Sequence, residues 1–120
     1  MQMTMIEALN QALTLELERD KRVVVFGQDI GVNGGVFRVT ERLQEKFGEQ
    51  RVFDTPLSES AIIGSAVGMS VYGLRPVAEI QFAGFLFLCM SQLVTQAARM
   101  RFRRSSDNSR LVLISSRMSF

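Results

Sequence analysis

The stretch Val23-Val24-Val25-Phe26-Gly27 decides the fold. It is a short, continuous apolar run that is rich in β-branched residues and is closed by a glycine. Strands of parallel sheets are covered on both faces and therefore have this composition, because neither face needs polar residues. The run predicts a buried strand of a parallel sheet.

Segments of helical and strand character alternate around this run. Thr4-x-x-Glu7 is a capping-box pattern, and it begins a predicted helix over residues 4–19. Further helices are expected over residues 39–47, 60–72 and 85–103, and further strands over residues 51–53, 76–82 and 111–114. The alternation predicts an α/β fold, a parallel sheet flanked by helices, within one domain over residues 1–120.

The predicted helix over residues 60–72 carries unusually small side chains. Gly64 and Gly68 lie four residues apart on one face, flanked by Ala61 and Ser65. A glycine in a helix interior costs about 1 kcal/mol relative to alanine. The face therefore predicts that another backbone packs closely there, either from the same chain or from another subunit.

The composition excludes several kinds of site. The chain has no histidine, which removes Ser-His-Asp and Cys-His catalysis and most zinc sites. Proton transfer here needs a carboxylate, the thiol of Cys89 or the phenol of Tyr72. One cysteine allows no internal disulfide, and no secretory signal opens the chain, so we expect a reducing, cytoplasmic location. The glycine-rich loop over residues 31–35 lacks the spacing of a dinucleotide-binding motif or a P-loop.

Basic residues crowd the last quarter of the chain, opposed only by Asp107. They are Arg99, Arg101, Arg103, Arg104, Arg110 and Arg117. A nucleic-acid or phosphate patch is one interpretation, and a solvated helix end followed by a loop is the other. Phe102 is the one aromatic residue interleaved with these arginines. We therefore favour the solvated helix end and loop, and we expect no nucleic-acid partner. The most apolar run, residues 83–90, is shorter than the ~20 residues that cross a bilayer, so we expect no membrane partner.

Three blocks of the sequence resemble one family in their order and spacing. They are Gly34-Gly35-Val36-Phe37-Arg38-Val39-Thr40, Phe53-Asp54-Thr55-Pro56-Leu57-Ser58-Glu59 and Arg75-Pro76-Val77-Ala78-Glu79-Ile80-Gln81-Phe82. They resemble the N-terminal part of the beta subunit of the thiamine-diphosphate-dependent first component of pyruvate and branched-chain 2-oxo acid dehydrogenase complexes. The resemblance covers about residues 3–104 and implies a transketolase-like pyrimidine-binding domain.

The resemblance implies roles for four residues. Glu59 matches the glutamate that hydrogen-bonds N1′ of the cofactor's aminopyrimidine ring, and Leu57, Gln81 and Phe85 match positions that line the pyrimidine pocket. A carboxyl group at N1′ exchanges a proton with the ring and so favours its imino tautomer, which is the base that the thiazolium C2–H needs. Apolar walls from Leu57 and Phe85 would keep this proton shared with the ring.

These residues also have structural interpretations. Glu59 begins a helix, where the macrodipole alone favours an acidic residue. Phe85 is equally a plain core residue, and Gln81 on a strand is by itself typical of a surface. For Glu59 the resemblance favours the catalytic role. Cys89 lies in a predicted apolar helix, which indicates a buried and inert thiol.

The resemblance also implies partners. The Gly-Asp-Gly motif, followed later by Asn, that binds the diphosphate and magnesium is absent from this chain. In the family it lies on an alpha subunit, which forms a heterotetramer with the beta subunit, and the acyl group passes to a lipoyl-bearing acyltransferase component. We therefore expect a thiamine diphosphate site shared with an alpha subunit, no metal ligand in this chain, and no activity from the chain alone.

The sequence departs from the family pattern after Arg103. Arg104-Ser105-Ser106-Asp107-Asn108 stands where the family has a Ser-Gly-Gly type of turn, which predicts an incomplete domain that is truncated, frame-shifted or divergent. Two other functions stay open. One is a non-catalytic remnant or interaction module of the same fold, and the other is half of another thiamine-diphosphate enzyme, such as a transketolase-like synthase.

Overall fold

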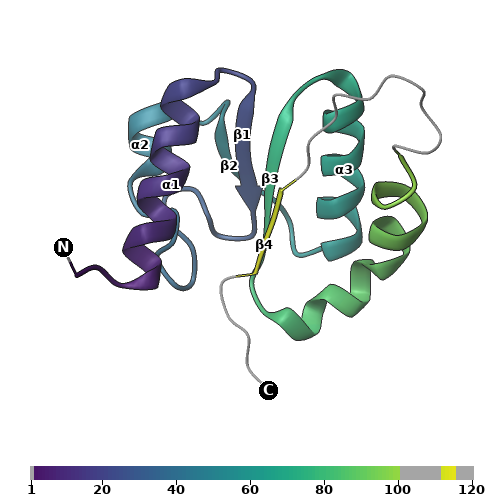
Figure 1. Cartoon of the computed structure of the whole chain (residues 1–120). Coiled ribbons are helices and arrows are strands. Elements are labelled where there is room, and N and C mark those ends of the chain that lie inside the picture. Colours follow the sequence, from purple (N-terminus) through teal and green to yellow (C-terminus); the bar gives the residue numbers. More distant parts are fainter. Residues whose placement is uncertain (1, 101–111, 116–120) are drawn as a thin grey trace.

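A parallel sheet lies between two helical layers (Figure 1). The computed structural model describes residues 2–100 and 112–115. In this part of the chain the sheet has four parallel strands in the order β2-β1-β3-β4. The strands are Val23–Gly27 (β1), Val52–Asp54 (β2), Arg75–Ile80 (β3) and Val112–Ser115 (β4). The predicted α/β fold is confirmed, and the run that decides it is a central strand.

Helices cover both faces of the sheet. α1 (Met5–Arg19) and α2 (Leu43–Phe47) lie on one side, and α3 (Glu59–Tyr72) lies on the other (Figure 1). A 3₁₀ helix, η1 (Ala83–Cys89), and a π-helix, η2 (Gln92–Ala97), follow β3 on the side of α3. The adjacent strands β1 and β3 therefore send the chain to opposite faces of the sheet. In α/β sheets, ligand sites form at the carboxyl ends of such strand pairs.

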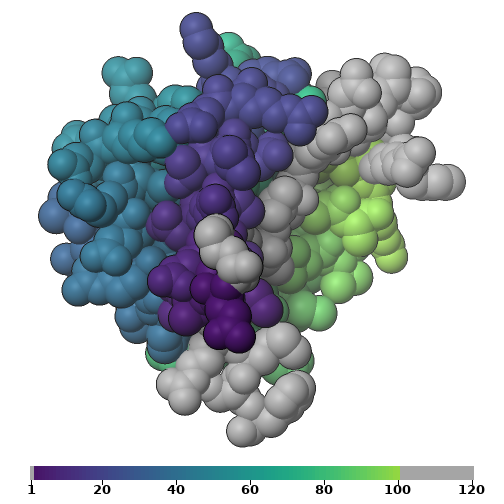
Figure 2. All heavy atoms as spheres, turned by 60° about the vertical axis from the view of Figure 1, so that its left-hand side comes forward, coloured from purple at the N-terminus to yellow at the C-terminus, as the bar shows by residue number. Residues whose placement is uncertain are grey.

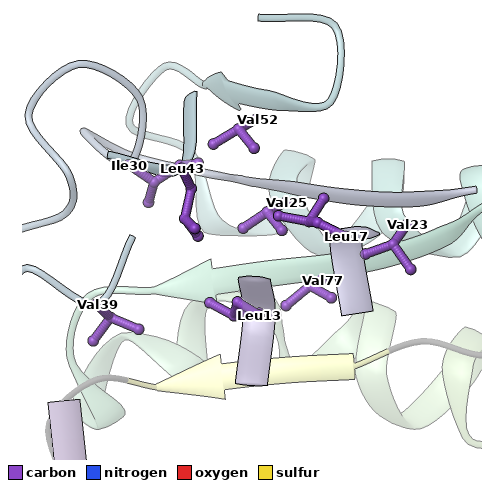
Figure 3. Packing of buried hydrophobic residues seen from close by; sticks show 9 residues of the cluster. All are labelled: Leu13, Leu17, Val23, Val25, Ile30, Val39, Leu43, Val52 and Val77. Carbon is purple, nitrogen blue, oxygen red and sulfur yellow. The ribbon is translucent and has the colours of Figure 1, made fainter. Parts of the chain in front are cut away.

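Alternate residues of β1 enter two separate cores. Val23 and Val25 face α1, which crosses the front of the molecule in Figure 2. Figure 3 shows this first core, formed by Leu13, Leu17, Val23, Val25, Ile30, Val39, Leu43, Val52 and Val77. Val24 and Phe26 point to the other face and pack with residues of α3, β3 and η1. Full burial of such a side chain contributes about 1.5–3 kcal/mol, so this short strand stabilises both layers.

The ends of α1 and α3 agree with their sequence signals. In the capping box of α1, Thr4 N donates to Glu7 Oε2 (2.7 Å) and Glu7 N donates to Thr4 Oγ1 (3.2 Å). The hydrogen bond from the Thr4 backbone lowers the pKa of Glu7. α3 ends at Gly73, as predicted, where φ is 108°. This left-handed conformation favours glycine after the last helical residue.

The predicted helix over residues 39–47 is shorter in the structure, where α2 covers only Leu43–Phe47. Arg42 has a φ of 63°, a left-handed backbone that interrupts a right-handed helix. The pattern was misleading because Val39 and Leu43, four residues apart, are both buried in the first core. Val39 reaches that core from a loop. The predicted end of the helix at Gly48 is confirmed.

The prediction of one long α-helix over residues 85–103 is wrong in its described part. Phe82 and Phe85 meet edge to face with ring centroids 5.3 Å apart, and Phe85 N donates to Phe82 O (3.0 Å). This three-residue spacing matches a 3₁₀ turn, in which residues i and i+3 eclipse. Further on, Ala98 N donates to Leu93 O (2.9 Å), which is the wider spacing of a π-helix. Residues 101–103 lie outside the described residues.

Three strand predictions are confirmed with shifted bounds. β2 and β4 each lie one residue later than predicted, and β3 ends at Ile80, so Gln81 and Phe82 belong to the following loop. The predicted loop over residues 105–109 lies outside the described residues, as does most of the arginine cluster.

The small-residue face of α3 meets no close backbone of its own chain among the described residues. A Cβ on Gly64 would lie 3.7 Å from Gln92 Cγ, and a Cβ on Gly68 would meet nothing within 4 Å. At these two glycines, no backbone atom of another segment within residues 2–100 and 112–115 would lie within 4 Å of an added Cβ. Packing against another subunit stays a prediction.

Asp20 joins the amino ends of the strands. Its carboxylate accepts hydrogen bonds from Arg22 Nη2 (2.9 Å) and Nε (3.1 Å), and Arg75 Nη1 lies 3.1 Å from it. Arg51 Nη2 donates to the Asp20 carbonyl (2.8 Å). These bonds connect the turn before β1 with residues that begin or precede β2 and β3. The hydrogen bonds from Arg22 lower the pKa of Asp20 to about 2.

Replacing Asp20 with asparagine should lower the free energy of unfolding at neutral pH. The folded-state pKa of about 2 lies below the ordinary value of 3.8. The contribution of the carboxylate is therefore complete above that ordinary value and is lost as the pH falls toward the folded value. Urea unfolding of the wild type and of Asp20→Asn at several pH values measures the difference, which should shrink in acid. A difference that stays constant between neutral pH and about pH 2 would contradict this assignment.

Candidate functional site

Glu59 is the first residue of α3 and follows the loop that leaves β2. Ser58 precedes it as the N-cap residue, in an extended conformation, and its side chain makes no capping hydrogen bond. Glu59 is half-buried. The positive end of the helix dipole favours a negative charge at this position. An acidic residue here therefore has a structural explanation that does not depend on any chemical role.

The wall beside Glu59 is formed by η1. Ser60 Oγ donates to Leu88 O (2.6 Å), which joins the first turn of α3 to η1. Cys89 is fully buried, and its Sγ donates to Leu86 O (3.3 Å). Burial raises the pKa of the Cys89 thiol, and the charge of Glu59 raises it further. Cys89 is therefore a neutral, buried thiol, as predicted, and it lies near enough to Glu59 to respond to its charge.

The other predicted site residues share the carboxyl edge of the sheet with Glu59. Phe85 belongs to η1 and is 38% exposed, whereas Leu57 is 66% exposed in the loop before α3. Gln81 is half-buried directly after β3, with its Nε2 3.5 Å from Gln28 O. The structure thus brings Glu59 next to the element that carries Phe85. It ties Gln81 to the loop after β1 and leaves Leu57 largely open to solvent.

Three aromatic rings cross the carboxyl edge. Phe37 and Phe82 meet with ring centroids 5.6 Å apart, and Phe82 and Phe85 meet at 5.3 Å, both pairs edge to face. Such pairs contribute about 0.5–1.5 kcal/mol each beyond the area they bury. The row connects the loop after β1 with η1 and so holds Phe85 in place.

Two further carboxylates shape this edge. Asp54 Oδ1 accepts a hydrogen bond from Gly31 N (2.7 Å), which fixes the loop after β1. Glu79, 3% exposed, lies opposite Gly27 in β3, and the buried Ile80 follows it as the last residue of the strand. A Cβ on Gly27 would lie 2.7 Å from the Glu79 carbonyl oxygen, so this close approach requires glycine. The sequence signal for Glu79 is a charged residue inside an apolar strand.

Ser60 is the residue of this edge that the sequence analysis missed. A serine in the first turn of a helix usually bonds to its local backbone or faces solvent. Here its hydroxyl bonds to a carbonyl 28 residues away in sequence. No spacing pattern signals such a contact.

Four cavities among the described residues lie beside the predicted site residues, and none of these four is lined by them. A cavity of about 160 Å³ between β2 and α3 is lined by Phe26, Phe53, Thr55, Pro56, Ser58, Ala61, Ile62, Ser65 and Met69. Three wider hollows, of about 480, 400 and 390 Å³, lie around α1, α2 and the loop between β1 and α2. Their linings carry charges of both signs and are open to solvent. They offer no enclosed apolar site.

The described part of the chain has neither a metal-binding cluster nor a membrane-spanning helix. No three His, Cys, Asp or Glu side chains of residues 2–100 and 112–115 are grouped to hold a metal ion. No helix there is both long enough and apolar enough to cross a membrane.

Replacing Glu59 with glutamine should lower the pKa of Cys89, because the charge that acts on the thiol is removed. The pKa should stay above its ordinary 9.0, since burial is the larger cause of the shift. The pH dependence of Cys89 alkylation, followed by mass spectrometry, measures this. Glu49→Gln changes an exposed glutamate between α2 and β2 and should leave the pKa as it is. Identical titrations in Glu59→Gln and the wild type would show that the two groups are not neighbours.

Comparison with known proteins agrees with the α/β fold described above. The family described as "Transketolase, pyrimidine binding domain" matches residues 1–114. The chain is 61% identical to the 2-oxoisovalerate dehydrogenase subunit beta of Pseudomonas aeruginosa over 105 residues, which cover 88% of the chain and 30% of that protein. It is 62% identical to the pyruvate dehydrogenase E1 component subunit beta of Acholeplasma laidlawii over 100 residues, 83% of the chain and 31% of that protein.

A third relative extends the match along the chain. The chain is 56% identical to the pyruvate dehydrogenase E1 component subunit beta of Staphylococcus aureus over 115 residues, which cover 96% of the chain and 35% of that protein. The chain spans about a third of the length of these curated relatives. The family match covers nearly the whole chain. The chain therefore belongs to the transketolase pyrimidine-binding domain family.

Proposed function

We propose that this chain supplies the pyrimidine-binding part of a thiamine diphosphate site in the decarboxylating component of a 2-oxo acid dehydrogenase complex. Such a component oxidatively decarboxylates a 2-oxo acid and transfers the acyl group to a lipoyl arm. The observation that carries the proposal is Glu59, half-buried at the start of α3 against a neutral thiol. It lies in a chain that is 61% and 62% identical to beta subunits of two such dehydrogenases.

The proposed substrate class is a 2-oxo acid. One relative is named for 2-oxoisovalerate, a branched-chain acid, and another is named for pyruvate, at nearly equal identity. Both share the 2-oxo carboxylate group, and this shared group defines the class.

The described residues suit an aminopyrimidine ring, which has two apolar faces and a polar edge with nitrogen atoms. Glu59 offers a carboxyl group that is partly shielded from water. η1 offers exposed apolar side chains that a flat ring can cover, since Phe85, Phe87 and Leu88 are 38%, 79% and 61% exposed. Small-molecule sites commonly combine apolar walls with a few placed polar groups.

Each predicted residue has a distinct role in this proposal. Glu59 holds a proton at N1′ or releases it, and the apolar side chains of Leu57 and Phe85 exclude water from that carboxyl. Gln81 places an amide at the rim, beside the loop after β1. When bound, thiamine diphosphate supplies the nucleophilic carbon that attacks the 2-oxo group.

The proposal includes partners for what this chain lacks. The diphosphate and magnesium motif is absent from the sequence, so an alpha subunit, in a heterotetramer, would hold those groups. The open small-residue face of α3 is available for subunit packing. A lipoyl-bearing acyltransferase component would take the acyl group. The single cysteine suits a cytoplasmic enzyme.

Glu59→Gln in the protein assembled with its alpha subunit should lower kcat about 10²–10⁴-fold, the usual contribution of a positioned acid–base group. A glutamine at N1′ can form a hydrogen bond but cannot exchange a proton. Steady-state decarboxylation of a 2-oxo acid measures the effect, with Glu49→Gln as the matched surface control. A wild-type rate in Glu59→Gln would remove Glu59 from the mechanism.

The chain by itself should not decarboxylate 2-oxo acids, because it has no diphosphate-binding motif. Carbon dioxide release from the purified chain, with and without a cognate alpha subunit, tests this expectation. Turnover without the alpha subunit would contradict the shared site. Absence of thiamine diphosphate binding even with the alpha subunit would instead favour a non-catalytic remnant of the fold.

A further inference from the structure

One hydroxyl connects the two elements that carry the proposed pocket. Ser60 follows Glu59 in the first turn of α3, and its Oγ donates to Leu88 O in η1 (2.6 Å). The bond joins residues 28 positions apart. It is therefore a tertiary contact between α3 and η1.

This bond does not serve as a helix cap. A capping side chain accepts a hydrogen bond from a free N–H at the start of the helix. The hydroxyl of Ser60 instead donates to a carbonyl of another segment. The bond therefore fixes the position of η1 relative to α3.

The geometry of η1 carries the effect to Phe85. η1 is a 3₁₀ helix from Ala83 to Cys89, in which residues three apart lie on the same side, one turn from each other. Phe85 and Leu88 have this spacing. Fixing the carbonyl of Leu88 against Ser60 therefore also fixes the turn that carries Phe85 relative to Glu59.

Cys89 completes the contact between the two elements. It is 0% exposed and packs in the second core with Ile62 and Ile63 of α3. Its Sγ donates within η1, to Leu86 O (3.3 Å). If η1 moved away from α3, water would reach the buried thiol and the shielded part of Glu59. The exposure of Cys89 therefore reports whether this contact is closed.

We propose that Ser60 is a positioning residue for Glu59. Its hydrogen bond to Leu88 holds η1 against the first turn of α3, and so it sets the place of the carboxyl relative to the apolar wall that Phe85 presents to the aminopyrimidine ring. This inference rests on the proposed function. It adds a residue that acts through its neighbours and does not itself touch the cofactor.

Three variants test the role of Ser60. Ser60→Ala removes the hydroxyl, and Ser60→Thr keeps a hydroxyl at this exposed position. Thr14→Ala is the matched control, because Thr14 Oγ1 also donates to a backbone carbonyl, that of Asn10 (2.9 Å), but in α1 on the other face of the sheet.

The first readout needs no cofactor. In the protein assembled with its alpha subunit, Cys89 is alkylated at neutral pH and its labelling is followed by peptide mass spectrometry. Ser60→Ala should increase the labelling rate about two- to tenfold, the change expected for the loss of one hydrogen bond. Ser60→Thr and Thr14→Ala should label at the wild-type rate.

The second readout separates binding from chemistry. Ser60→Ala should raise the KM for thiamine diphosphate by a similar factor, about two- to tenfold, with a smaller change in kcat, and Ser60→Thr should restore it. A wild-type labelling rate in Ser60→Ala would overturn the proposal. Faster labelling with an unchanged KM would also overturn it, because Ser60 would then only stabilise the fold.

The two proposals fail in different ways. If Glu59→Gln keeps full activity, the proposed function fails whatever Ser60 does. If Glu59→Gln is inactive while Ser60→Ala matches the wild type in labelling and in KM, only the positioning role of Ser60 fails.

Discussion

The parallel pairing of β1 with β3 fixes where the two helical layers and the proposed site lie. The two strands are in register from Val23 opposite Arg75 to Gly27 opposite Glu79. At the last pair the backbones approach so closely that a Cβ on Gly27 would lie 2.7 Å from the Glu79 carbonyl oxygen. This pairing aligns the carboxyl ends of β1 and β3, from which the chain turns to opposite faces of the sheet. The proposed site lies along that edge.

The amino and carboxyl edges of the sheet carry different kinds of charged groups. At the amino edge, Asp20 binds Arg22 and Arg75 and connects the beginnings of the strands. These oppositely charged groups pair with one another and stabilise the fold. At the carboxyl edge, Glu59 begins a helix beside a neutral thiol. Within residues 2–100 and 112–115, no lysine or arginine forms a salt bridge with Glu59, whereas Asp20 has two such partners.

Local signals in the sequence predicted much of the fold. The apolar run of β1, the capping box at Thr4 and the stop at Gly73 each act within a few residues, and the structure confirms all three. Predictions were wrong where tertiary contacts override local pattern. Val39 is buried from a loop, and the ring contact of Phe82 with Phe85 accompanies a 3₁₀ turn where the pattern predicted an α-helix.

The site was predictable only in part, and for a similar reason. An acidic residue at the start of a helix is already explained by the helix dipole, so its position alone does not indicate a chemical role. The chemical role of Glu59 was predicted from the resemblance of three sequence blocks to a family. The fold then adds what no spacing encodes, which is the contact of Ser60 with Leu88. Leu57 was predicted as a pocket wall and is 66% exposed in this chain, so its place beside the ring stays a prediction.

In the proposed function, Glu59 shares a proton with N1′ of the aminopyrimidine ring. The most direct test is the ¹⁵N NMR signal of thiamine diphosphate labelled at N1′ and bound to the protein with its alpha subunit. We expect a protonated N1′ signal in the wild type that is lost in Glu59→Gln. The same N1′ protonation in both proteins would contradict it.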